Sequence, residues 1–258
     1  MYKNLSSDDY KKFLELPAEY HVDGMLCYGT WARAKQVEVF KNTLEKLGKK
    51  YEYGSLKGFL EQMVEFNVEG KRYWFDVSYG GALLSEYLHL ACLFGSKKNI
   101  LLGTCGGLSP EVPGSSVIFP TYSFGNESAT RMYDPAATDH KHHSDATLTS
   151  NLKKRFDDRY KSWEGGTTTC QAMMAETLED VQNWSAEGYL AVEMEAATVF
   201  SVSKHFKVPA AAILFVADNL IKGETVVGED FQKNKLLRTE IRNEQYKVAL
   251  EELLSEPL

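Results

Sequence analysis

The chain has 258 residues, of which 43% are hydrophobic, enough for a full core and too many for a disordered chain. Its formal net charge of −7 argues against a nucleic-acid partner, because a phosphate backbone requires a basic face. A small anion held by one or two local cations is compatible with that charge.

Short apolar runs alternate with amphipathic stretches, a pattern typical of strands joined by crossover helices. The predicted strands are 24–29, 73–78, 99–104, 116–120, 166–170, 190–192 and 210–217, with 116–120 expected beside 99–104. The predicted helices are 34–47, 82–94, 145–160 with Asp145 as N-cap, 176–186, 195–206 and 230–254. No linker or repeat interrupts this order, so we expect one domain over 1–258. The run Asp139–His143 lacks the helical i, i+4 spacing of a zinc site and predicts a solvated loop.

We expect neither a membrane-spanning segment nor a secretory signal in this sequence. No apolar stretch approaches the roughly 20 residues that span a bilayer. Residues 1–10 are polar and carry two aspartates, unlike a secretory signal. The cysteines stand singly, with no CxxC pair, which predicts free buried thiols, a reducing compartment and a cytoplasmic protein; they are Cys27, Cys92, Cys105 and Cys170.

Four predicted strand ends carry chemically unusual residues, and ligands of open α/β sheets collect at the carboxyl ends of strands. After Gly29, Arg33 stands at a helix start, where backbone amides and a guanidinium together suit an oxyanion. A surface arginine would show the same pattern. Gly103–Gly107 offers a turn of amides and the Thr104 hydroxyl for a phosphate or sugar oxygen, although a structural turn also uses such glycines.

The other two strand ends are acidic. Glu193 and Glu195 flank Met194 where a strand enters a helix. Acids in a first helical turn are often only dipole partners, but Glu193 falls on a buried run, where a sugar diol would compensate its burial. Asp218 follows the apolar strand 210–217 and can protonate a heterocyclic nitrogen or cap the next segment.

These segments resemble, in order, the motifs of nucleoside phosphorylases of the purine and uridine phosphorylase superfamily. The heptapeptide GTWARAK (29–35) looks like the phosphate loop, GTCGG (103–107) like the glycine turn, and AVEMEAA (191–197) like the ribose motif. The resemblance implies an α/β fold of a single domain, with a central mixed twisted sheet flanked by helices. It implies phosphate binding by Gly29, Arg33 and Thr104, ribose binding by Thr130, Glu193, Met194 and Glu195, and base binding by Cys170, Gln171, Met173 and Asp218.

Two departures from the family pattern concern the molecule that attacks the sugar, which is phosphate in the phosphorylases and water in their hydrolytic cousins. The phosphorylases of this family carry a second phosphate-binding arginine where this chain has Leu101. Loss of one charge-assisted hydrogen bond weakens phosphate binding by roughly 10- to 150-fold. The hydrolytic cousins need a carboxylate near the first strand end, where this chain has Thr30 and Trp31.

The sequence thus predicts a pentosyltransferase that cleaves a nucleoside, with a purine base expected from Asp218, using phosphate as co-substrate and Arg33 and Asp218 as catalytic residues. A nucleosidase, a uridine phosphorylase and a non-catalytic nucleoside binder are the alternatives. We expect no metal, no organic cofactor, no nucleic acid and no membrane as partners. By resemblance we expect a homo-oligomer, either a dimer, a trimer or a hexamer.

Overall fold

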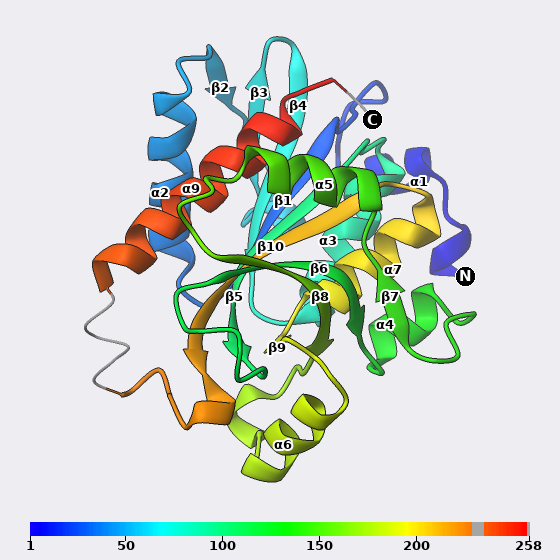
Figure 1. Ribbon diagram of the computed structural model, residues 1–258. Coiled ribbons are helices and arrows are strands. Elements are labelled where there is room, and N and C mark those ends of the chain that lie inside the picture. The colour runs from blue at the N-terminus through cyan, green and yellow to red at the C-terminus, as the bar shows by residue number, and fades with distance from the viewer. Residues whose placement is uncertain (229–234, 257–258) are drawn as a thin grey trace.

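The computed structural model describes residues 1–228 and 235–256 (Figure 1). Its strands are β1 (Gly24–Gly29), β2 (Tyr51–Tyr53), β3 (Val64–Val68), β4 (Lys71–Ser78), β5 (Asn99–Gly107), β6 (Val117–Phe124), β7 (Lys141–His143), β8 (Ser162–Thr169), β9 (Ala191–Glu193) and β10 (Ala210–Asn219). Its helices are α1 (Ser7–Phe13), α2 (Arg33–Lys46), α3 (Gly81–Leu93), α4 (Ser128–Tyr133), α5 (Ala146–Arg155), α6 (Leu178–Ala186), α7 (Ala196–Phe206) and α9 (Lys235–Leu253).

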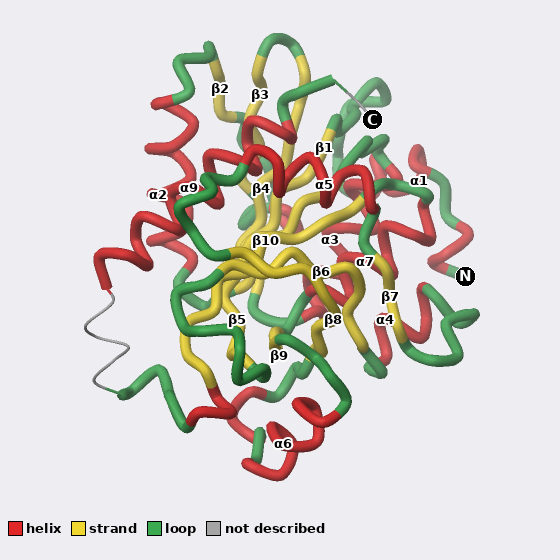
Figure 2. The backbone as a smooth tube through the Cα atoms, in the orientation of Figure 1, coloured by secondary structure: helices red, strands yellow, loops and turns green. Residues whose placement is uncertain are grey.

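The strands form one mixed sheet in the order β10-β6-β8-β9-β5-β1-β4-β3-β2, with β7 paired to β6. Because β10 also pairs with β5, the strands β10, β6, β8, β9 and β5 close into a ring, and β1, β4, β3 and β2 extend from β5 as an open sheet. Helices cover both faces (Figure 2). The predicted mixed sheet flanked by helices is confirmed.

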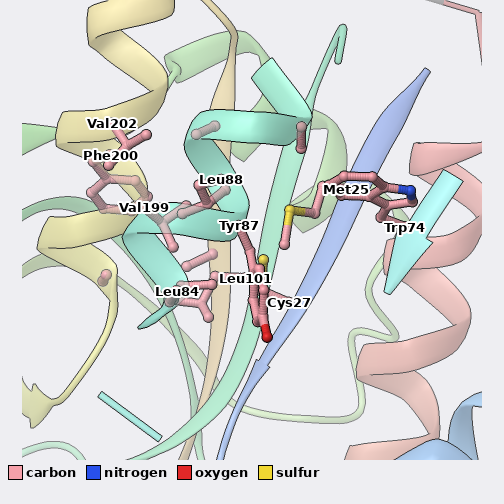
Figure 3. Close-up of a cluster of buried hydrophobic side chains, with 14 of the residues drawn as sticks. Met25, Cys27, Trp74, Leu84, Tyr87, Leu88, Leu101, Val199, Phe200 and Val202 are labelled. Atoms are coloured by element: carbon pink, nitrogen blue, oxygen red, sulfur yellow. The ribbon is translucent and has the colours of Figure 1, made fainter. Parts of the chain in front are cut away.

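Two hydrophobic cores lie on opposite faces of the sheet, as alternation along β1 shows. Met25 and Cys27 point toward α3 and α7, and Leu26 and Tyr28 point toward α2, α5 and α9. Figure 3 shows the first core, where side chains of α3 and α7 pack against those of β1 and β5. This alternation decides which face each residue near a strand end can reach.

Several predictions of elements were wrong or incomplete. Strand β6 pairs with β8 and β10 rather than with β5, because β1, β9 and β10 already occupy the edges of β5. The helix predicted to run to 160 ends at Arg155, although Asp145 caps it as expected. The predicted helix 230–254 is confirmed from Lys235 onward, and its residues 230–234 lie outside the described residues. The short elements α1, α4, β2, β3 and β7 were not predicted.

The prediction of a solvated loop at residues 139–143 was wrong. Lys141–His143 form β7, and His142 is 1% exposed. Its two ring nitrogens contact the Asp134 carboxylate and the Gly125 carbonyl oxygen, each at 3.2 Å.

In the described ranges, no three side chains of His, Cys, Asp or Glu gather as metal ligands would. Across the same ranges, every helix is too short or too polar to span a bilayer.

Candidate functional site

The four segments with unusual residues meet at one edge of the sheet. Strands β1, β4 and β5 run parallel, and Gly29 at the end of β1 lies between Ser78 and Gly103. Strand β10 also runs parallel to β5 and brings Asp218 opposite Gly106. Strand β9 pairs with β5 at Gly106 and Gly107, and it leads directly into α7. Strand pairing therefore brings the acidic and basic segments to the same end of the sheet.

The Glu195 carboxylate lies at the centre of this edge and is 5% exposed. It accepts a hydrogen bond of 2.7 Å from the backbone amide of Gly80. It also packs on Gly29, where an added Cβ would overlap the carboxylate. Burial, followed by the charge of Glu193, raises the pKa of Glu195 to about 8. The ionised form of such a buried carboxylate is stabilised when a ligand donates hydrogen bonds to it from hydroxyl groups.

Glu193, which the sequence predicts to bind ribose, has a carboxylate that accepts hydrogen bonds within the protein. It accepts from the backbone amides of Glu195 at 2.7 Å and Ala196 at 2.5 Å. It also accepts from the Ser123 hydroxyl at 2.9 Å and from the Thr169 hydroxyl. Glu193 thus anchors the start of α7 and orients Glu195.

Thr130, also predicted to bind ribose, likewise forms hydrogen bonds within the protein. Its side chain is fully buried, and its hydroxyl lies within 2.6 Å of the Glu127 carboxylate and 3.1 Å of the Gly125 carbonyl oxygen. The second oxygen of Glu127 accepts from Thr198 on α7 at 3.0 Å. Thr130 therefore joins α4 to α7 through Glu127.

Arg33 is the first residue of α2, and its Nη1 is buried without a hydrogen-bond partner among the described residues. A carboxylate that the sequence reasoning missed lies near it. Asp76 of β4 is 1% exposed and accepts from the Ser78 hydroxyl. Burial raises the pKa of Asp76, whereas the Ser78 hydrogen bond and the Arg33 charge act in the opposite direction. A charged residue within the apolar run 73–78 was the signal that could have revealed it.

Leu101 lies in the same row of side chains as Asp76, because Cys27 pairs with both residues across β1. Leu101 is fully buried among apolar side chains, near Cys27 and Leu84 (Figure 3). Thr104, three residues further along β5, is exposed. The phosphate-loop end of the site therefore has Arg33 and Thr104, with an apolar side chain where the family arginine is expected.

The residues predicted to line the base side follow β8. The Cys170 amide donates to the Glu193 carbonyl oxygen at 2.8 Å, which ties this segment to the ribose motif. The Gln171 amide lies against Gly81, where an added Cβ would be 2.5 Å from Nε2. The Met173 sulfur lies 3.9 Å from the Tyr79 hydroxyl, which belongs to the segment that binds Glu195. Cys170, Gln171 and Met173 thus border the Glu195 region.

Two acids lie on this base side. Burial, followed by Glu224, raises the pKa of Asp218 to about 6. Burial, with a further contribution from Asp218, raises the pKa of Glu176 to about 7, and the Cys170 thiol hydrogen-bonds to Glu176. Glu176 was missed at the sequence level because it precedes its helix and has no partner at a recognisable spacing. At the outer edge, the Trp31 and Tyr79 rings meet edge-on, with centroids 5.3 Å apart.

These interactions form a continuous chain through the site. Glu195 contacts Gly29 and Gly80, and its charge acts on Tyr79, as does that of Glu176. Glu176 in turn interacts with Asp218. Two concave regions of about 570 and 340 Å³ lie elsewhere and contain none of the candidate residues; they are lined by residues of 150–164 and 131–142.

Comparisons with known proteins identify the fold and the family of this chain. A uridine phosphorylase from Vibrio fischeri ES114, solved with 6-hydroxy-1-naphthoic acid, superposes with a TM-score of 0.70 over 94% of this chain and 97% of its own, at 15% identity. A DeoD-type purine nucleoside phosphorylase of Exiguobacterium sibiricum is 27% identical over 212 residues, 75% of this chain and 85% of its own length. A guanosine phosphorylase of Halorubrum lacusprofundi is 31% identical over 125 residues, 47% of this chain and 50% of its own.

The fold and the sequence relatives define an enzyme of the pentosyltransferase class. The sequence profile of the phosphorylase superfamily matches residues 82–242, which include the glycine turn, the ribose motif and Asp218. The chain belongs to the phosphorylase superfamily.

Proposed function

We propose that this enzyme cleaves the N-glycosidic bond of a purine nucleoside with inorganic phosphate, giving the free base and ribose 1-phosphate. The observation that carries the proposal is the position of the buried Glu195 carboxylate, between the phosphate loop at Gly29 and the acids of the base side. The reaction needs the same order of groups, because phosphate attacks the anomeric carbon from the side away from the base and the sugar therefore lies between phosphate and base.

In this reaction Glu195 accepts hydrogen bonds from the ribose hydroxyls, and Met194, 9% exposed, packs against the sugar. Glu193 keeps Glu195 in place through the amides at the start of α7. The high pKa of Glu195 means that hydroxyl donors favour its ionised form, so ribose binding and proton release are coupled.

Phosphate binds at Gly29, Arg33 and Thr104, where the buried Nη1 of Arg33 has no acceptor among the described residues. A phosphate oxygen forms a bond to the anomeric carbon while the bond from that carbon to the base nitrogen breaks. Positioning and electrostatic stabilisation of the cationic sugar provide most of the acceleration. The proposal needs no organic cofactor or metal.

Asp218 donates a proton to N7 of the departing purine, and its pKa of about 6 keeps part of the population protonated near neutrality. Glu176 lies near Asp218 and can accept from N–H donors of the base. The purine assignment is supported by this pair and by the names of the relatives, which are called purine nucleoside and guanosine phosphorylases. Cys170, Gln171 and Met173 border the base.

We also propose a single domain over 1–258, a cytoplasmic location and a homo-oligomeric assembly.

A nucleoside panel assayed with and without phosphate tests this proposal. Purine nucleosides should release base only when phosphate is present, and uridine should react more slowly. Hydrolysis is the second candidate, favoured by Asp76 beside Arg33 and by Leu101. Equal rates without phosphate, with free ribose as product, would select hydrolysis. Ligand-induced stabilisation without turnover would select a binding protein.

A further inference from the structure

The phosphate end of the site has fewer cationic groups than its family pattern provides. Leu101 replaces a family arginine, and the Asp76 carboxylate interacts with Arg33. Inorganic phosphate carries one to two negative charges at neutral pH, and each charge-assisted hydrogen bond to it matters. An anion site that relies on Arg33 alone would therefore be weak, and further cations must come from another element.

A cluster of cations lies beside this edge, on the opposite face of the sheet from Leu101. It comprises Lys35 of α2 with Arg238 and Arg242 of α9. The charges that act on Lys35 are all positive, since Arg242, Lys235 and Arg238 lower the pKa of Lys35 together with its burial. Positive charges that gather in this way repel one another and favour the binding of an anion.

The position of α9 places this cluster close to the phosphate segments. The Gln245 amide donates to the Gly103 carbonyl oxygen at 3.1 Å, so α9 lies directly on the residue that precedes Thr104. The Tyr246 hydroxyl reaches the Gln36 side-chain oxygen at 3.2 Å, which joins α9 to the first turns of α2. Figure 1 shows these two helices packed together on the same face of the sheet.

Arg242 lies one helical turn before Gln245 and Tyr246, toward the N-terminal end of α9. Its guanidinium interacts with the hydroxyl of Tyr28, the residue that precedes Gly29. The Nε of Arg242 is buried and has no hydrogen-bond partner among the described residues. Thr104 faces this side, because alternation along β5 puts it on the same face as Leu102, in the core covered by α9.

We propose that Arg242 and Lys35 form part of the phosphate site and replace the cation that the family pattern places at position 101. The inference rests on the proposed phosphorolysis, which supplies the reason for a phosphate at this edge. Arg242 donates through its unpaired Nε, and Lys35 adds charge from the first turn of α2. Neither residue belongs to the motifs of the glycine turn or the ribose segment.

Calorimetric titration with inorganic phosphate tests the proposal without requiring turnover. Arg242→Gln should weaken phosphate binding by about 10- to 100-fold and Lys35→Gln by roughly 3- to 10-fold, as expected for lost charge-assisted bonds. Arg242→Lys should keep part of the affinity. Lys247→Gln is the matched control, since Lys247 lies on α9 but is 49% exposed and pairs with Glu244 at 3.3 Å. It should bind phosphate like the wild type.

Steady-state kinetics separates this inference from the proposed function. The Michaelis constant for phosphate should rise in Arg242→Gln, while that for the nucleoside stays within about twofold. Wild-type phosphate affinity in both Arg242→Gln and Lys35→Gln would overturn the inference, even with phosphorolysis intact. Phosphate binding that depends on Arg242 without base release would refute the proposed function and leave the inference standing. If Arg242→Gln does not fold, the exposed Lys35 still provides the test.

Discussion

Replacing Asp218 with asparagine removes the proton that the proposed reaction delivers to the purine. Asp218 is 6% exposed, and its pKa of about 6 compares with 3.8 for an ordinary aspartate. At pH 7 the protonated fraction is therefore about 10%, against roughly 0.1% without the shift. The environment of Asp218 thus supplies on the order of 100-fold more acid, within the range of general acid catalysis.

We expect Asp218→Asn to lower kcat/KM for inosine by about 100-fold at pH 6, and by at least roughly tenfold at pH 7. Only the protonated form of Asp218 can donate, so the rate depends on the protonated fraction of this residue. The wild-type rate should fall as pH rises through about 6, and this limb should disappear in Asp218→Asn. Glu224→Gln should move the limb to lower pH, because the charge of Glu224 raises the pKa of Asp218.

The assay compares inosine with an N7-alkylated purine nucleoside, whose base is already cationic and departs as a neutral molecule. Asp218→Asn should spare the alkylated substrate, since its leaving group needs no proton. An equal loss on both substrates would show that Asp218 serves binding or structure. An unchanged rate on inosine would remove Asp218 from the mechanism.

Three further substitutions, the first with Gly103→Ala as its control, test individual contacts. Gly29→Ala should displace the Glu195 carboxylate and lower kcat/KM by roughly 10- to 150-fold, whereas Gly103→Ala, whose Cβ first meets another atom at 3.5 Å, should have a small effect. The pKa of Glu195 is raised to about 8, so the wild type should lose unfolding free energy as pH rises from about 5 to above 8. Glu195→Gln has no charge to bury, and urea unfolding should therefore show it becoming more stable relative to the wild type over that pH range. A pH-independent difference would contradict the burial argument. Thr130→Val should lose about 1–3 kcal/mol of unfolding free energy with an unchanged KM for the nucleoside, and a large rise in that KM would restore Thr130 to the sugar site.

Much of the fold was predictable because its strands and helices are long and strongly patterned. β1 and β5 are apolar runs that end in glycines, and α7 follows its strand without a loop. The neighbour of β6 could not be predicted, since strand order depends on which edges of β5 remain open. The three-residue strands β2 and β7 are too short for periodicity to reveal.

Within the site, the motifs identified the segments but not how each side chain is used. Glu193 and Glu195 are equally acidic in sequence, yet two side-chain hydroxyls and two backbone amides donate to Glu193, whereas the Gly80 amide donates to Glu195. Asp76 and Arg242 come from elements outside the motifs, so only the packing of β4 and α9 against the end of β1 brings them near. Pairing and packing therefore decide roles that residue type alone leaves open.

Phosphorus NMR of a reaction with inosine and inorganic phosphate tests the central claim most directly. The account predicts that inorganic phosphate is consumed as ribose 1-phosphate appears, in equal amount to the hypoxanthine released, and that Glu195→Ala abolishes both signals of turnover. Hypoxanthine release with an unchanged phosphate resonance, or turnover in Glu195→Ala equal to that of the wild type, would contradict it.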